Sequence, residues 1–183
     1  CEHFLSGFFS PAPPGHRVAP VMLPNGKVFR AEPAARFAIS CLALRAALGA
    51  GYEERPPIGR HLQSLAQISE QWTEWNRYFP PDVVVAGLHA LADGGRDYRP
   101  AVHRLVDLVT ANQGVEGDWP AADLIQVLDA LLAAGTPEAQ VAVRRATTAL
   151  TARQRADGTF GVRTQQERAL IGLRALLWGA RAP

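Results

Sequence analysis

Two segments of this 183-residue chain share one pattern, a glutamine followed at fixed distances by a glycine and an aromatic residue. The first copy spans residues 113–119 (Q-G-V-E-G-D-W), and the second, 41 residues later, spans residues 154–160 (Q-R-A-D-G-T-F). Self-similarity at a period of about 20 to 50 residues is typical of repeat architectures, in which each unit buries its apolar face only against its neighbours. The chain is therefore expected to consist of stacked tandem units.

Each copy lies between two segments with the periodicity of a helix. The i, i+3, i+4, i+7 spacing of apolar residues precedes both copies, at Val102, Leu105, Val106 and Val109 and at Val143, Ala146 and Leu150. After the copies, residues 123–134 and 165–178 are apolar on more than one face. This pattern predicts hairpins made of an outer helix, a turn and a more deeply buried inner helix.

Weaker forms of the same unit occur earlier in the chain. Residues 60–75 and 82–91 are expected to form an outer and an inner helix, and residues 32–48 another inner helix. The prolines of residues 11–14 argue against an outer helix before it, so residues 1–30 are expected to be an irregular cap that includes Phe4, Phe8 and Phe9. The sequence thus predicts an all-α domain over residues 1–183, with about four hairpins over residues 31–183 in a curved two-layer array.

The turns have a physical rationale. An Asn25-Gly26, Glu116-Gly117 or Asp157-Gly158 step permits the positive backbone φ that ends a helix and redirects the chain. The aromatic residue two positions after the repeat glycine is expected to pack between neighbouring hairpins, and the glutamine to hydrogen-bond to loose backbone groups.

Composition excludes several classes of protein. The formal charge of +2, with Lys27 as the only lysine, does not indicate a nucleic-acid partner, and the arginine and alanine bias is typical of a GC-rich bacterial genome. No apolar run approaches the roughly 18 residues of a membrane span, so a soluble, cytoplasmic protein is expected.

Cys1 and Cys41 are too few for a disulfide framework or a zinc site, and Cys41 is expected to be a buried thiol. We expect no metal and no cofactor.

The glutamine, glycine and tryptophan of residues 113–119, placed between an outer and an inner helix, resemble the QW repeat of the terpenoid-cyclase and prenyltransferase superfamily, the α/α toroid. Residues 154–160 are a conservative variant of it, and at the level of repeat architecture the resemblance covers most of residues 24–179. It implies a toroid-like fold and an apolar, isoprenoid-type ligand, with acid-initiated cyclisation as the expected chemistry of an isomerase or lyase.

The sequence also departs from this family. The resemblance implies an Asp-x-Asp-Asp acid motif, an Asp-rich Mg²⁺ motif or an Asp/Cys/His zinc set, depending on the branch, and none of these is recognisable. The Cys-His-Gly motif of lanthionine-cyclase relatives is also absent. About four inner helices are few for a closed ring, which leaves an open crescent, a small toroid or half of an assembly as alternatives.

Alignment of the inner helices on a shared Leu-x-Ala motif places Arg45, His89, Asp129 and Arg174 at one repeat position. If that position faces the concave centre, the arginines are expected to bind an anionic group, with Asp129 and His89 as candidate catalytic residues. One or two turns earlier, additional candidate ligand-binding residues are Asp82, Gln126 and Glu167.

Two other interpretations remain open at this stage. A polar residue at matching repeat positions also arises from a solvated stripe, in which arginine and carboxylate form surface pairs of little energetic value. The domain is alternatively a non-catalytic interaction module that uses its concave face or the end of the repeat stack to bind another protein chain or a second copy of itself.

Overall fold

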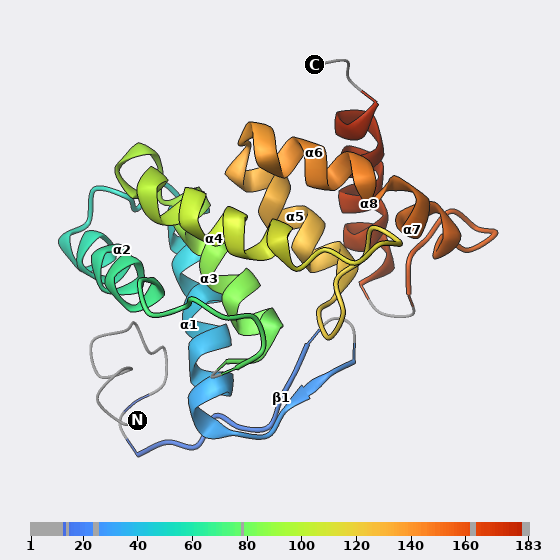
Figure 1. Cartoon of the computed structure of the whole chain (residues 1–183). Helices are drawn as coiled ribbons and strands as arrows, with labels where there is room; N and C mark the ends of the chain where they lie inside the picture. The colour runs from blue at the N-terminus through green and yellow to red at the C-terminus, as the bar shows by residue number, and fades with distance from the viewer. Residues whose placement is uncertain (1–12, 14, 24–25, 78, 162–163, 181–183) are drawn as a thin grey trace.

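A computed structural model of the chain describes residues 13, 15–23, 26–77, 79–161 and 164–180 (Figure 1). The described part is mostly helical, which confirms the predicted all-α class in its coarse form. In chain order the elements are β1 (Val21–Met22), β2 (Val28–Phe29), α1 (Glu32–Gly49), α2 (Pro56–Ser69), α3 (Pro81–Asp93), the 3₁₀ helix η2 (Arg96–Tyr98), α4 (Arg99–Ala111), α5 (Leu124–Ala134), α6 (Pro137–Arg145), α7 (Thr147–Ala152) and α8 (Gln165–Gly179).

The helices form two rows. In the inner row α1 packs against α3, α3 against α5, and α5 against α8. The outer helices α2, α4 and α6 each contact two consecutive inner helices as well as one another in sequence (Figure 1). Each predicted inner helix is present, and α1 and α8 are the two ends of the inner row.

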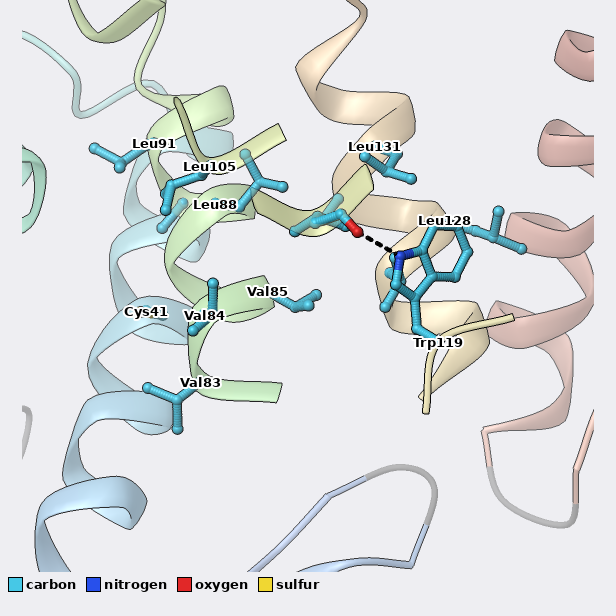
Figure 2. Close-up of a cluster of buried hydrophobic side chains, with 14 of the residues drawn as sticks. Cys41, Val83, Val84, Val85, Leu88, Leu91, Leu105, Trp119, Leu128 and Leu131 are labelled. Atoms are coloured by element: carbon cyan, nitrogen blue, oxygen red, sulfur yellow. Dashed lines mark hydrogen bonds between the residues drawn. The ribbon is translucent and has the colours of Figure 1, made fainter. Parts of the chain in front are cut away.

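Burial explains this arrangement. The outer helices α2 and α4 bury one apolar stripe each, whereas α3 and α5 are buried on several faces because helices cover them from both sides and from the outer row. The largest fully buried side chains come mainly from the inner helices and the stripes that cover them: Phe37, Leu44, Leu65, Leu88, Leu91, Leu105, Leu128, Leu131 and Leu150 (part of this core is drawn in Figure 2).

Both copies of the repeated pattern have the same turn. Gly117 has φ +85° and Gly158 has φ +81°, the left-handed conformation that glycine adopts without a Cβ penalty. In each copy the glutamine Nε2 donates to the carbonyl of the glycine four residues later, at 2.9 Å from Gln113 and 3.2 Å from Gln154. Gln113 Nε2 also donates to Ala142 O at 2.8 Å, which ties its turn to the next outer helix.

The aromatic residues of the pattern are both buried. Trp119 donates from Nε1 to Val109 O at 2.8 Å, so its one polar atom is satisfied inside the core (Figure 2). Phe160 is buried against Gly172 of α8, where an added Cβ would lie 2.4 Å from the ring. These contacts lie within one hairpin each, because Val109 lies in the last turn of the outer helix before Trp119 and Gly172 belongs to the inner helix after Phe160. The expected packing between neighbouring hairpins stays a prediction.

The N-terminal part differs from the prediction. Gly26, with φ +86°, lies between two short antiparallel strands, in which Val21 pairs with Phe29 and Met22 with Val28. An Asn-Gly step between apolar residues is a strong hairpin signal, and the expectation of a purely irregular cap missed it. Phe4, Phe8 and Phe9 lie outside the described residues.

Two predicted outer helices have different boundaries. The helix expected over residues 60–75 begins at Pro56 and ends at Ser69, so Trp72 and Trp75 follow it in a turn region. The apolar stripe at residues 143–150 is divided between α6 and α7, which meet at Ala146. Val143, Ala146 and Leu150 are all buried, so the apolar spacing continues across the junction of the two short helices. For this reason the sequence pattern did not reveal the break.

Candidate functional site

A cavity of about 110 Å³ lies where the four inner helices face one another, with the β-hairpin on one side. All four inner helices contribute to its wall, and about half of the lining is apolar. The lining residues are Leu23, Phe29, Ala38, Cys41, Leu42, Arg45, Asp82, Val85, Ala86, His89, Ile125, Gln126, Asp129, Thr164, Glu167, Arg168 and Ile171. Six of the seven residues that the sequence suggested for a site therefore border one cavity.

At the centre of this wall three helices bring their polar residues together. His89 Nδ1 of α3 lies 3.4 Å from Asp129 Oδ2 of α5, and Arg45 Nη2 of α1 lies 3.7 Å from the same oxygen. Asp93, one helical turn after His89, accepts a 2.9 Å hydrogen bond from Arg45 Nε and lies 3.8 Å from His89 Nε2. The shared repeat position thus produces a cluster of interacting side chains.

Arg174 occupies the same repeat position but has a different environment. It is exposed on α8 and does not border the cavity, although it is close enough for its charge to act on His89 and Asp129. The environment of Arg174 therefore fits the alternative interpretation of a solvated polar stripe, whereas His89 is only 6% exposed.

Burial controls the protonation of His89. Loss of solvent lowers its pKa to about 3, and the positive charges of Arg45 and Arg174 act in the same direction. The carboxylates of Asp93 and Asp129 oppose this shift, but at 3.8 and 3.4 Å they are farther away than in a strong charge-assisted hydrogen bond. His89 is therefore a neutral imidazole near neutral pH.

The pKa of Asp129 is shifted in the opposite direction, upward. Burial raises the pKa of its carboxyl group, and the charges of Asp93 and Glu167 act in the same direction. Arg45 and Arg174 counteract part of this increase. The site therefore pairs a neutral imidazole with a carboxyl group that holds its proton more tightly than an exposed aspartic acid does, which is the pattern expected of an acid–base pair.

Two ion pairs close the side of the cavity nearest to the hairpin. Lys27 Nζ lies 2.5 Å from Asp82 Oδ2, and the same ammonium group donates to Ala121 O at 3.1 Å. Arg168 of α8 forms a two-pronged pair with Asp123 at 2.6 and 3.0 Å. Asp82 Oδ1 links both pairs because it accepts from the backbone N–H of Asp123. This network joins the hairpin to the first turns of three inner helices.

Sequence reasoning missed Lys27, Asp93, Asp123 and Arg168 as members of the site. The spacing of Asp93 four residues after His89 was a usable signal, because residues at i and i+4 share a helix face. Asp123 was readable as a helix N-cap, and its side chain does accept from Ile125 N. For the seven residues that the sequence did suggest, the roles in binding or catalysis stay predictions.

We expect the neutral state of buried His89 to make the fold sensitive to acid. An unfolded histidine takes up a proton below pH about 6.5, whereas the folded one does so only near pH 3, so stability is lost as the pH falls through this window. A pKa difference of this size corresponds to a contribution to the free energy of unfolding on the order of 5 kcal/mol. Urea unfolding of the wild type and His89→Gln between pH 7 and 3 should give a shallower loss for the variant; parallel curves would contradict the assignment.

No group of three or more His, Cys, Asp or Glu side chains in the described segments has an arrangement that holds a metal ion. Cys41 is buried in the cavity wall, and burial raises the pKa of its thiol, so it is not activated as a thiolate. None of the helices in the described ranges is both long and apolar enough to cross a bilayer.

Comparisons of the chain with protein-family models, with curated proteins and with solved structures find no match.

Proposed function

We propose that the cavity between the inner helices is an acid–base site for a small, mainly apolar ligand that carries one polar group. The observation that carries this proposal is the contact of His89 with Asp129 inside a partly apolar cavity, where burial favours the neutral form of both side chains. Leu42, Ile125 and Ile171 contribute apolar surface to the same cavity. Arg45 lies at the same cavity and is suited to orient a polar or anionic substituent.

The chemistry that fits this pair is proton transfer to and from one substrate. Protonated Asp129 donates its proton to an electron-rich carbon or oxygen of the ligand, and the positive charge develops on the ligand. A second proton then leaves the rearranged ligand, and His89 or the Asp129 carboxylate accepts it. His89 returns any proton that it has accepted to Asp129 across the contact between them. The product is an isomer of the substrate, so no co-reactant is needed.

The volume of the cavity restricts the substrate. Pockets that enclose drug-sized ligands have volumes of about 300 to 1,000 Å³, and this cavity of about 110 Å³ is much smaller. Among the described residues that line it, Phe29 is the only aromatic one. This lining does not form the aromatic-rich chamber expected for a long polyprene. Within the isoprenoid class suggested by the toroid-like repeat, short-chain substrates are therefore favoured.

We expect Asp129→Asn to lower turnover by about 100-fold or more while ligand binding is retained, because asparagine keeps the shape of the side chain but has no acidic proton. The assay uses short prenyl diphosphates, neutral short-chain alkenes and alcohols, and long neutral polyprenes, with product detection by gas chromatography and mass spectrometry. Asp107→Asn, at an exposed carboxylate on the outer helix α4, is the matched control and should leave turnover unchanged.

Unchanged turnover in Asp129→Asn would remove this residue as the acid. If the wild type neither binds nor converts any compound of the panel, the result would favour the alternative of a non-catalytic interaction module. Thermal shift measurements on the same panel separate these cases, because a ligand that binds only the folded state raises the unfolding temperature even when no reaction follows.

A further inference from the structure

The last helix of the inner row has an uncovered apolar face. Leu170, Leu173 and Leu177 of α8 follow the i, i+3, i+7 spacing of one helix face and are 57%, 53% and 59% exposed. This face lies on the side of α8 opposite to Ile171 and Ala175, which are buried. We call Leu170, Leu173 and Leu177 the leucine face.

The repeat shows what normally covers such a face. In the alignment of the inner helices, the counterparts of Leu170 and Leu173 in α5 are Ile125 and Leu128, which are almost completely buried. Helix α5 is followed in the row by α8, which packs against it, whereas α8 has no following inner helix within the described chain. The leucine face therefore corresponds to the surface by which an inner helix contacts the next inner helix in the row.

The other half of this interface is uncovered at the opposite end of the row. The alanine of the shared Leu-x-Ala motif points to nearly the opposite side of the helix from the leucine two positions earlier, and it is buried in the three later inner helices, at Ala90, Ala130 and Ala175. Its counterpart in α1, Ala46, is exposed, and Leu42 one turn earlier is 54% exposed. We call Leu42 and Ala46 the alanine face of α1.

We propose that the leucine face of α8 binds the alanine face of α1 in a second copy of this chain, so that the inner row continues from one molecule into the next. The occupant is identified by the internal row, in which α3 packs on α1, α5 on α3 and α8 on α5. Within the described residues, the leucine of the shared motif is exposed only in α8 and its alanine only in α1, so one uncovered half of each kind is left. Large leucines against a small alanine allow close approach of the two helices.

The charges at the junction are compatible with this contact. Arg45 beside the alanine face is already ion-paired with Asp93, and Arg174 beside the leucine face is attracted by Asp129, so both positive charges are partly neutralised within each copy. The contact joins two different faces, so it repeats head to tail and either closes into a ring or forms a longer row. It does not depend on the proposed acid–base function.

The test uses sedimentation velocity and light scattering of the whole chain. The wild type is expected to self-associate at micromolar concentration, and Leu173→Glu on α8 or Ala46→Glu on α1 should each raise the dissociation constant at least tenfold. An equimolar mixture of the two variants should restore association into a dimer only, because each variant retains the face that the other lacks. Val141→Glu, at an exposed apolar position on α6, is the matched control and should associate like the wild type.

Circular dichroism verifies that each variant is folded, and Leu177→Glu replaces Leu173→Glu if that variant is not. A monomeric wild type over the whole concentration range, or a single variant that associates like the wild type, would overturn the proposal. Failure of the mixed variants to associate would also overturn it, since a contact between two copies of one face would not be complemented in this way.

Discussion

Replacement of Gly117 by alanine is expected to lower the free energy of unfolding by about 3 kcal/mol or more. Its φ of +85° is unfavourable for a residue with a Cβ, which alone costs about 1 to 2 kcal/mol. An added Cβ would also lie 2.2 Å from Arg145 O at the end of α6, and this backbone carbonyl has no free rotation by which to withdraw. The turn and the next hairpin would have to separate.

Gly158→Ala is the matched control for this change. Gly158 has nearly the same φ, +81°, in the equivalent turn, but its added Cβ would meet only Gln154 Nε2 at 3.9 Å. We therefore expect this control to show the cost of positive φ alone. Urea unfolding of both variants measures the difference, and equal losses would contradict the idea that Gly117 is required for contact between neighbouring units.

Replacement of Arg168 by methionine is expected to destabilise the fold by about 3 to 5 kcal/mol. The change keeps a long apolar side chain but leaves the carboxylate of Asp123, whose side chain is only 4% exposed, without its two-pronged partner. A buried charge without compensation is far more costly than the buried pair itself. Thermal and urea unfolding at neutral pH measure this loss.

Two further variants test the cause of that loss. Arg153→Met breaks a 2.7 Å pair with Asp118, but this pair is largely exposed and its loss should cost at most about 1 kcal/mol. Adding Asp123→Asn to Arg168→Met should recover part of the lost stability, because asparagine is uncharged and still caps α5. A double variant no more stable than Arg168→Met would show that packing rather than charge is responsible.

Much of the fold was predictable because its signals are local. The prolines at the start of α3, the glycines at positive φ and the apolar spacing of the helices act within a few residues, so the inner helices appear close to their predicted boundaries. The pairing of Val21–Met22 with Val28–Phe29 was missed, because the repeat argument interpreted the Asn-Gly step in the sequence as a helix end. The break at Ala146 had no local signal.

The candidate site was predictable only in part. The repeat alignment identified Arg45, His89 and Asp129 as equivalent, and these three side chains do approach one another. It gave Arg174 the same status, but α8 is the end of the row, so that side chain lies in solvent. A pattern along the chain cannot distinguish an internal unit from a terminal one, because exposure depends on whether a neighbour follows.

The sequence by itself determined that the chain forms glycine-hinged helical hairpins with a buried aromatic side chain after Gly117 and Gly158, since periodicity and turn chemistry act over short distances. Only the tertiary structure decided the volume of the cavity, the partners of Lys27 and Arg168, and the two uncovered faces at the ends of the row. These properties arise where helices about 40 residues apart are packed side by side. Their geometry is set by the shapes of many side chains at once, so no single segment of the chain contains it.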